Sequence, residues 1–158
     1  LPVFVPRHME RRSEVREDLQ QLGYSVVLRS DMQVSRSSRP RCFVIDSTGE
    51  LRDWTAHADI AIIGKSWLEK GGQNPAEAIT AGVPVISGKR MDNFEPLVSS
   101  LVANHAMVKL ERVEGLSKVI EELLSKPEKV TEMTGAARSV LAAHSGATER
   151  SIRELQAG

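Results

Sequence analysis

Short apolar runs alternate with longer amphipathic segments along the chain. The apolar runs predict strands at residues 3–5, 24–28, 42–45, 58–63, 83–87 and 106–108. Apolar residues at helical spacing predict helices at 10–22, 51–58, 75–81, 94–102, 113–124 and 127–143, with a last amphipathic helix in the C-terminal segment 145–158. Strands that are apolar throughout and alternate with helices are typical of a parallel sheet covered on both faces. The pattern therefore predicts an α/β fold in a single domain over residues 1–158.

Composition narrows the classes of function. The 21 Lys and Arg residues balance the 21 Asp and Glu residues, so no net field recruits nucleic acid or an anionic membrane. The basic cluster Arg36, Arg39 and Arg41 has no interleaved aromatic residue, which favours a solvated loop over a nucleic-acid site. The one cysteine, Cys42, excludes a disulfide within the chain and a cysteine metal site, and it is expected to be buried. No apolar run reaches the roughly 18 residues of a membrane span.

Candidate binding residues follow the predicted strands. In an open parallel sheet, ligands bind outside the carboxyl ends of the strands. Arginine suits bidentate contact with phosphate, glycine lets the backbone approach a ligand, and a helix start offers free N–H groups. A nucleotide phosphate is the ligand that this set of groups suits best. The residues at the strand ends are Arg7, His8, Arg29, Ser30, Ser47, Thr48, Gly49, Glu50, Gly71, Gly72, Gln73, Asn74, Glu77 and Asn93.

Several of these residues also have a structural interpretation. Asn74 and Glu77 fit a helix capping box around Pro75, and the sequence leaves capping and ligand binding equally open there. Ser47 and Glu50 fit a second capping box, and there the structural interpretation is favoured. A lone histidine after a strand is more often a packing residue than a catalyst. The chain shows no paired carboxylates for acid–base chemistry, no metal-ligand cluster, no nucleophile elbow, no P-loop and no GxGxxG turn.

Taken in order, these blocks resemble a known family. The blocks are Pro6-Arg7-His8 with Glu10-Arg11, Arg29-Ser30, Asp46-Ser47-Thr48-Gly49-Glu50-Leu51, Gly71-Gly72-Gln73-Asn74-Pro75-Ala76-Glu77 and the segment 88–94. From about residue 3 to the C-terminal helix, the chain resembles the C-terminal half of the bacterial 3-deoxy-D-manno-octulosonic acid (Kdo) transferases. The resemblance implies a Rossmann-like domain with helices on both faces of a parallel sheet, the C-terminal half of a GT-B fold. It implies CMP-Kdo as the donor substrate, without a metal or other cofactor.

The resemblance also assigns roles. Arg7 would face the donor phosphate or the Kdo carboxylate, and the turn at 47–50 would lie by the cytosine and ribose. Asn74 would sit at the phosphate, and Glu77 would accept hydrogen bonds from the ribose hydroxyls. The family usually has histidine at Gln73 and glycine at Lys65, and its His-Thr-Phe-Asn-Phe block stands here as Arg90-Met91-Asp92-Asn93-Phe94.

The rest of the enzyme is expected outside this chain. Residue 1 already lies in an apolar run and is not a methionine, which suggests a domain cut from a longer protein and truncated at its N-terminus. In the family, the catalytic carboxylate and the site for the acceptor, a lipid A precursor, belong to the N-terminal domain. We therefore expect a soluble donor-binding fragment, inactive alone, of a lipopolysaccharide-synthesis enzyme on the cytoplasmic face of the bacterial inner membrane.

Two other functions remain open from the sequence. Other GT-B proteins, such as UDP-sugar transferases and sugar-nucleotide epimerases, place a similar glycine loop and glutamate in the same position. The chain could also be a non-catalytic α/β interaction module. We rank the module lowest, because a scaffold has no need for two arginines and two helix starts at one edge of a sheet.

Overall fold

A computed structural model describes residues 1–6, 9–31 and 42–157; for residues 9 and 145–157 only the backbone is described. The chain divides into two compact units, Leu1–Arg52 and Asp53–Gly158. Arg7 and His8 lie outside the described residues, as does the basic cluster at Arg36, Arg39 and Arg41. The two units are described separately below.

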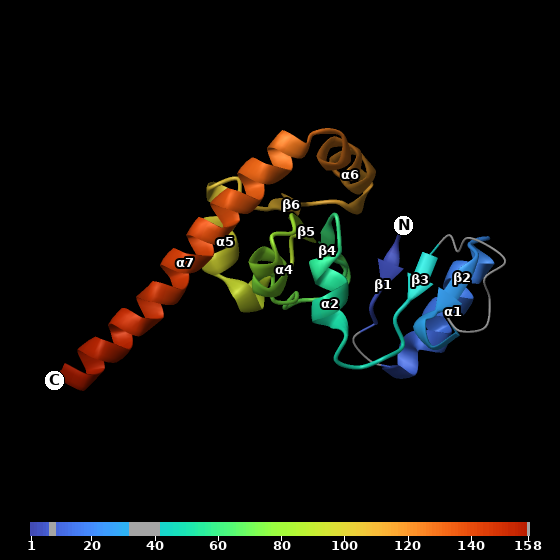
Figure 1. Cartoon of the computed structure of the whole chain (residues 1–158), viewed down its shortest axis with the longest axis horizontal. Helices are drawn as coiled ribbons and strands as arrows, with labels where there is room; N and C mark the ends of the chain where they lie inside the picture. Colours follow the sequence, from blue (N-terminus) through green and yellow to red (C-terminus); the bar gives the residue numbers. More distant parts are fainter. Residues whose placement is uncertain (7–8, 32–41, 158) are drawn as a thin grey trace. The chain divides into compact units, whose positions relative to one another are not determined.

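The first unit is built on a three-stranded parallel sheet (Figure 1, blue to cyan). Its central strand is β3 (Cys42–Val44), between β1 (Val3–Phe4) and β2 (Val26–Leu28). Cys42 and Val44 are fully buried, as the apolar run predicts, whereas Val3 and Phe4 on the edge strand are more than one-third exposed. The described residues of this unit also form two 3₁₀ turns, η1 (Met9–Arg11) and η2 (Arg29–Asp31), and helix α1 (Arg12–Gln21).

Helix α1 ends at the glycine that the sequence suggests. Gly23 has φ +81°, and its N–H donates to the carbonyl of Gln20 at 2.9 Å. The Tyr24 N–H donates to the carbonyl of Leu19 at 3.0 Å. These two hydrogen bonds are those of a Schellman motif, which satisfies the last carbonyls of the helix and turns the chain toward β2.

The second unit contains another three-stranded parallel sheet, in the order β4 (Ala61–Ile63), β5 (Val85–Gly88) and β6 (Val108–Leu110). Val85 and Ile86, adjacent on the central strand, are each at most 1% exposed. Val85 packs with Ile79 and Leu101 on one face, and Ile86 packs with Leu123 on the other. The sheet is therefore covered on both faces, as a continuously apolar strand requires.

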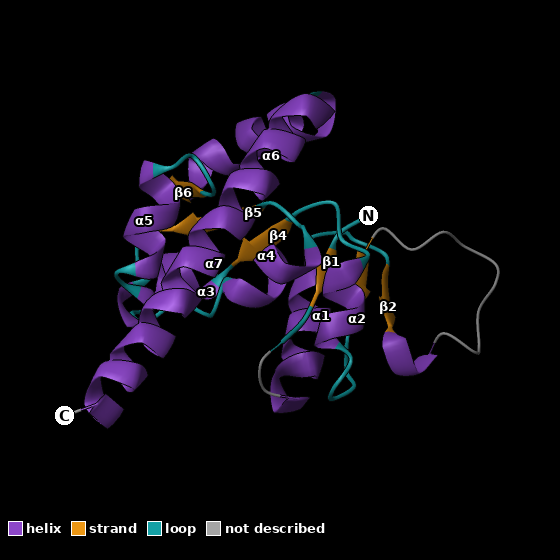
Figure 2. Cartoon of the chain, turned by 60° about the vertical axis from the view of Figure 1, so that its left-hand side comes forward, coloured by secondary structure: helices purple, strands orange, loops and turns teal. Residues whose placement is uncertain are grey.

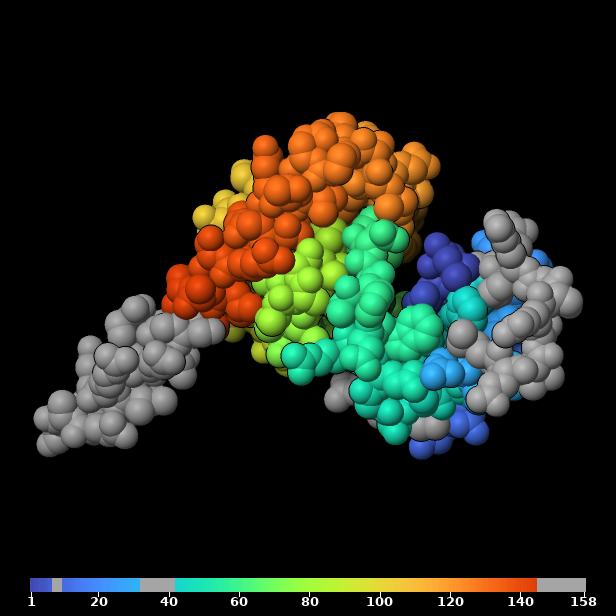
Figure 3. Space-filling view, in the orientation of Figure 1, coloured from blue at the N-terminus to red at the C-terminus, as the bar shows by residue number. Residues whose placement is uncertain are grey.

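The helices that cover this sheet are visible in Figure 2. Helices α4 and α5 contribute to the Val85 cluster, whereas α6 contributes to the Ile86 cluster. In the space-filling view, the described part of α7 (orange-red) lies against α4 (yellow-green) (Figure 3). The remaining elements are α2 (Leu51–Ala56), α3 (Lys65–Leu68), α4 (Ala76–Ala81), η3 (Asp92–Phe94), α5 (Leu97–Ala103), η4 (Val113–Gly115), α6 (Leu116–Ser125) and α7 (Pro127–Ala157).

The α/β class and the parallel pairing of strands are confirmed, with three differences of detail. The strands form two sheets, so the predicted strand ends fall into two groups, one per unit. The helix predicted at 94–102 is split, because Pro96 stands between η3 and α5 and starts the new helix. Helix α7 runs without a break over the two helices predicted after Pro127, since an interior glycine weakens a helix without ending it. Within the described part of the chain, no helix is both long and apolar enough to span a membrane.

His105 ends helix α5 in a backbone conformation that favours glycine. Its φ is +54°, and the next residue, Ala106, donates to the carbonyl of Leu101 at 2.8 Å. A side chain in this left-handed region costs about 1 kcal/mol. We expect His105→Gly to raise the free energy of unfolding by about 0.5–1 kcal/mol, measured as a shift in the urea midpoint. His105→Ala keeps the Cβ and is the control; equal stability of the two variants would contradict this interpretation.

Candidate functional site

The predicted residues of the first unit meet at the carboxyl ends of β2 and β3. Ser30, directly after β2, donates from its hydroxyl to Asp46 Oδ2 at 2.5 Å and from its N–H to Asp46 Oδ1 at 2.9 Å. Asp46, which the sequence analysis did not select, directly follows Ile45 and is 8% exposed. Burial opposes its ionisation, but the hydrogen bonds from Ser30, a hydrogen bond from its own N–H and the charge of Arg12 together outweigh burial, so the pKa of Asp46 lies below its ordinary value. A charged carboxylate therefore joins the ends of these two strands.

Arg29 forms an ion pair within the same unit. Its Nε donates to Glu50 Oε2 at 3.2 Å, and both side chains are partly exposed. The guanidinium that the sequence offers to a phosphate is thus already beside a carboxylate. Because the pair is exposed to water, it contributes little to stability, and a stronger anion can compete for Arg29.

The capping box predicted at Ser47 and Glu50 is wrong. Ser47 Oγ is buried without a hydrogen-bond partner among the described residues, and α2 begins only at Leu51. Gly49, with φ +85°, turns the chain between Ser47 and the helix, and Glu50 faces Arg29 instead. Thr48 is exposed at this turn. A buried hydroxyl with no partner is uncommon in a folded protein, so Ser47 is better placed to bind a ligand than to cap a helix.

The predicted site residues of the second unit follow β4 and β5, and a buried serine that was not predicted, Ser66, lies between the ends of these two strands. Ser66, on α3 directly after β4, is fully buried; its hydroxyl donates to the Ile63 carbonyl at 2.5 Å and accepts from the Gly88 N–H at 2.6 Å. A Cβ at Gly88 would lie 2.7 Å from the Ser66 carbonyl oxygen, so only glycine fits there. Ser66 thus joins the ends of two neighbouring strands, and the sequence analysis missed it because it lies in a helix that was not predicted.

Gly71 and Gly72 are tightly packed and do not form a loose loop. Both have positive φ values, +99° and +62°. A Cβ at Gly71 would lie 2.7 Å from Asn93 Nδ2, and one at Gly72 would collide with Met91 Sδ and lie 3.1 Å from the Arg90 carbonyl oxygen. The glycines therefore let the loop after β4 approach the segment after β5 closely. Asn93 lies directly against Gly71, so two of the predicted site residues are in contact.

The start of α4 presents Asn74 and Glu77. Asn74 Oδ1 accepts the Ala76 N–H at 3.0 Å, which confirms its capping role. Within the described part of the chain, Glu77 makes no hydrogen bond back to Asn74, so the second half of that capping box is wrong. Gln73, Asn74 and Glu77 are exposed. The Glu77 carboxylate is therefore available to a ligand while the helix remains capped.

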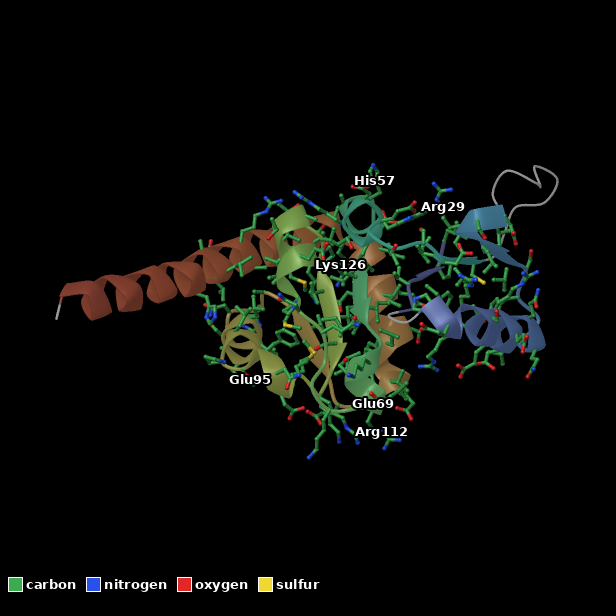
Figure 4. All side chains as sticks on the ribbon, turned by 90° about the horizontal axis from the view of Figure 1, so that it is seen from below. Arg29, His57, Glu69, Glu95, Arg112 and Lys126 are labelled. Atoms are coloured by element: carbon green, nitrogen blue, oxygen red, sulfur yellow. The ribbon has the colours of Figure 1, made fainter. Side chains whose placement is uncertain are left out.

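A hollow of about 290 Å³ lies beside this helix start. Asn74 and Asn93 line it together with Glu95, Phe94 and His144. Glu95 accepts hydrogen bonds from the Ser99 N–H and hydroxyl, which, with Lys109 3.7 Å away, hold the pKa of Glu95 below its ordinary value. Figure 4 shows Glu95 and Glu69 at the end of the second unit where its strands end, and His57 at the opposite end. Among the described residues, no group of three His, Cys, Asp or Glu side chains is arranged to hold a metal ion.

Comparisons with known proteins give consistent matches. Residues 37–140 match the family model described as glycosyl transferases group 1. The chain is 33% identical over 156 residues to a 3-deoxy-D-manno-octulosonic acid transferase of Bordetella pertussis, and 30% identical over 157 residues to one of Haemophilus influenzae. Each alignment covers 99% of this chain and 36% of the relative, so the chain spans about a third of the length of these transferases.

A solved structure also matches. It is the C-terminal CMP-Kdo binding domain of WaaA from Acinetobacter baumannii, 31% identical, with a TM-score of 0.82. The superposition covers 88% of this chain and 72% of that domain. The structural likeness thus extends over most of both chains.

The hydrogen bonds between Ser30 and Asp46 predict a pH dependence of stability. We expect Asp46→Ala to lower the free energy of unfolding by about 1–3 kcal/mol at pH 7, because the Ser30 donors lose their acceptor. The folded pKa lies below the ordinary value of 3.8, so this contribution is full above that value and is lost as the pH falls through the folded pKa. Urea unfolding of wild type and variant between pH 7 and pH 3 measures it. A difference in stability that stays constant or grows toward low pH would contradict the assignment.

The glycines predict a graded series of alanine variants. Gly72→Ala combines a positive φ with a collision, and we expect it to cost about 2–4 kcal/mol of unfolding free energy. Gly49→Ala meets no neighbour but keeps the positive φ, and we expect a cost of about 1 kcal/mol. Gly64, with φ −58° and no neighbour within 4 Å, is the control, and its alanine variant is expected to be about 0.4–1 kcal/mol more stable. Thermal or urea denaturation ranks the three variants; a Gly72→Ala variant as stable as wild type would show that the loop is loosely held.

Proposed function

Because the chain belongs to the group 1 glycosyltransferases and is homologous over nearly its whole length to Kdo transferases, we propose that it is the donor-binding domain of such an enzyme and binds CMP-Kdo. The observation that carries this proposal is the match, with a TM-score of 0.82, to a domain described as CMP-Kdo binding. Since the chain spans about a third of the related transferases, the transfer reaction of the whole enzyme is part of the proposal.

In the second unit, we assign the phosphate and the ribose of the donor nucleotide to the start of helix α4. Asn74 would lie at the donor phosphate, where the first N–H groups of the helix have no acceptor one turn back. Glu77 would accept hydrogen bonds from the ribose hydroxyls, a role that suits a carboxylate because it would repel a phosphate. The Glu77 side chain is exposed and makes no capping hydrogen bond with the described residues, which supports this assignment. Gly71, Gly72, Gln73 and Asn93 would shape the surrounding loop.

In the first unit, Arg7 would face the donor phosphate or the Kdo carboxylate, since a guanidinium binds either anion in bidentate fashion, and His8 would be a further binding residue. The turn formed by Ser47, Thr48, Gly49 and Glu50 would lie by the cytosine and ribose. The unpartnered hydroxyl of Ser47 supports this assignment, because a ligand polar atom would satisfy it. Arg29 and Ser30 would complete the binding residues, with Arg29 exchanging its Glu50 partner for a ligand oxygen.

The chemistry would be transfer of Kdo from CMP-Kdo to an acceptor hydroxyl. The bond between the Kdo anomeric carbon and the phosphate oxygen breaks, and negative charge develops on the departing CMP. The N–H groups at the start of α4 would stabilise that charge electrostatically, the role that a metal ion has in other transferases. The base that removes the proton of the acceptor hydroxyl is assigned to the part of the enzyme outside this chain, so no residue here is proposed as catalytic.

The acceptor and the cellular setting are also proposed from the family. A lipid A precursor would receive the sugar, as a step of lipopolysaccharide biosynthesis on the cytoplasmic face of the bacterial inner membrane. The membrane and the acceptor would be contacted by the rest of the enzyme, and this chain would contribute only the donor site.

Calorimetric titration with CMP tests the donor site. We expect wild type to bind CMP, and we expect Glu77→Ala and Arg7→Ala each to weaken binding about tenfold or more, because each removes hydrogen bonds to a charged group. Glu121→Ala, which removes an exposed glutamate of helix α6, is the matched control and should bind as wild type does.

A parallel titration with UDP separates this proposal from a UDP-sugar enzyme. Protection from thermal unfolding by CMP and not by UDP is the expected outcome. Absence of CMP binding by the folded chain, or binding that neither Arg7→Ala nor Glu77→Ala changes, would overturn the site assignment.

A further inference from the structure

The segment after β5 holds the loop after β4 through three hydrogen bonds. The Arg90 N–H donates to the Ser66 carbonyl at 3.0 Å, and its Nη1 donates to the Leu68 carbonyl at 2.7 Å. Asp92 Oδ2 accepts the Gly71 N–H at 3.2 Å. The first two bonds fix helix α3, and the third fixes the glycine loop that follows it. Only the third uses an ionisable acceptor.

The bond from Gly71 to Asp92 fixes a short piece of chain that contains two consecutive glycines. Gly71 and Gly72 both have positive φ. Glycine adopts positive and negative φ about equally well, so a loop with two glycines that nothing holds would populate several conformations. Gly71 packs against the side chain of Asn93, the residue after Asp92. The carboxylate and the packing therefore select one conformation of the loop from the many that two glycines allow.

This conformation sets the position of the residues that follow. Only Gly72 and Gln73 separate Gly71 from Asn74, whose side chain caps α4 through the Ala76 N–H. We call the hydrogen bond from the Gly71 N–H to Asp92 the clamp. The clamp at Gly71 and the cap at Asn74 leave the loop between them little freedom. The placement of Asn74, and of Glu77 on the first turn of α4, thus depends on where Gly71 is held.

We propose that Asp92 is a positioning residue of the donor site: by accepting the Gly71 N–H, its carboxylate holds the loop 71–74 so that Asn74 and Glu77 meet a nucleotide phosphate and ribose. This inference rests on the proposed function. Asp92 acts through the loop, since its acceptor atom faces the backbone and a carboxylate beside a phosphate would repel it. The hydrogen bond from Gly71 is the main reason that the pKa of Asp92 lies below its ordinary value, and the cations Lys70 and Lys109 add to the effect.

The clamp is tested without a ligand by the Gly71 amide in ¹H–¹⁵N spectra between pH 7 and pH 3. The amide proton of wild type is expected to shift as Asp92 becomes protonated, at a pH below the ordinary value of 3.8. Asp92→Asn keeps an acceptor oxygen, so the Gly71 signal should stay close to its wild-type position and lose the titration. Asp92→Ala should move the signal at every pH. A Gly71 signal that is the same in Asp92→Ala and wild type overturns the proposal, because the clamp is then absent in solution.

The positioning role is tested by calorimetry with CMP at pH 7. We expect Asp92→Ala to weaken CMP binding about fivefold or more and Asp92→Asn to bind within about twofold of wild type, because the loop needs an acceptor and not a charge. Asp59→Ala, which removes an exposed aspartate before β4, is the control. Unchanged binding by Asp92→Ala overturns the proposal, and so does equal weakening in Asp92→Ala and Asp92→Asn. Absence of CMP binding by wild type overturns the proposed function and this role with it, whereas a Gly71 amide that titrates in the same sample shows that the clamp itself stands.

Discussion

The buried hydroxyl of Ser66 is the contact on which the candidate site of the second unit depends. It bridges the last carbonyl of β4 and the last N–H of β5, with no exposure to water. Hydrogen bonds in such a dry environment are strong, and a missing partner there is costly. Because the two strands end in fixed positions, the loops that leave them also start from fixed positions. The glycine loop, the segment that holds it and the start of α4 all follow from this junction.

The two units fix their loops by different means. In the first unit, a buried carboxylate, Asp46, takes both donors of Ser30, so the ends of β2 and β3 are joined by charge-assisted hydrogen bonds. In the second unit, a neutral hydroxyl joins the strands, and the charged group, Asp92, holds a loop beyond them. Each unit therefore has an acidic residue that faces its own backbone or a neighbouring hydroxyl.

Much of the fold was predictable from the sequence, since periodicity and buried runs are local signals. The runs at 42–45 and 83–87 are the central strands of their sheets, and Gly23 and Asn74 end and start helices as expected. The division into two sheets was not predictable, because pairing between strands depends on partners far apart in the sequence. Asp46 and Asp92 were missed because their partners are 16 and 21 residues away and no spacing rule links them, whereas Ser66 was missed because it lies in a short helix that was not predicted. Ser47 was misjudged because a serine three residues before a glutamate has the spacing of a capping box even where no helix begins at the serine. Here helix α2 begins only at Leu51.

The edge strand β1 has a consequence for work with the first unit by itself. Within the described residues of that unit, β1 lies at the edge of the sheet and pairs with β3, and Val3 and Phe4, with the following Val5, are 38–40% exposed. A short apolar edge strand that no other element covers is a template for pairing with another chain. A fragment that contains the first unit without the second would therefore be prone to association through β1. A charged residue in place of Val3 would oppose that association.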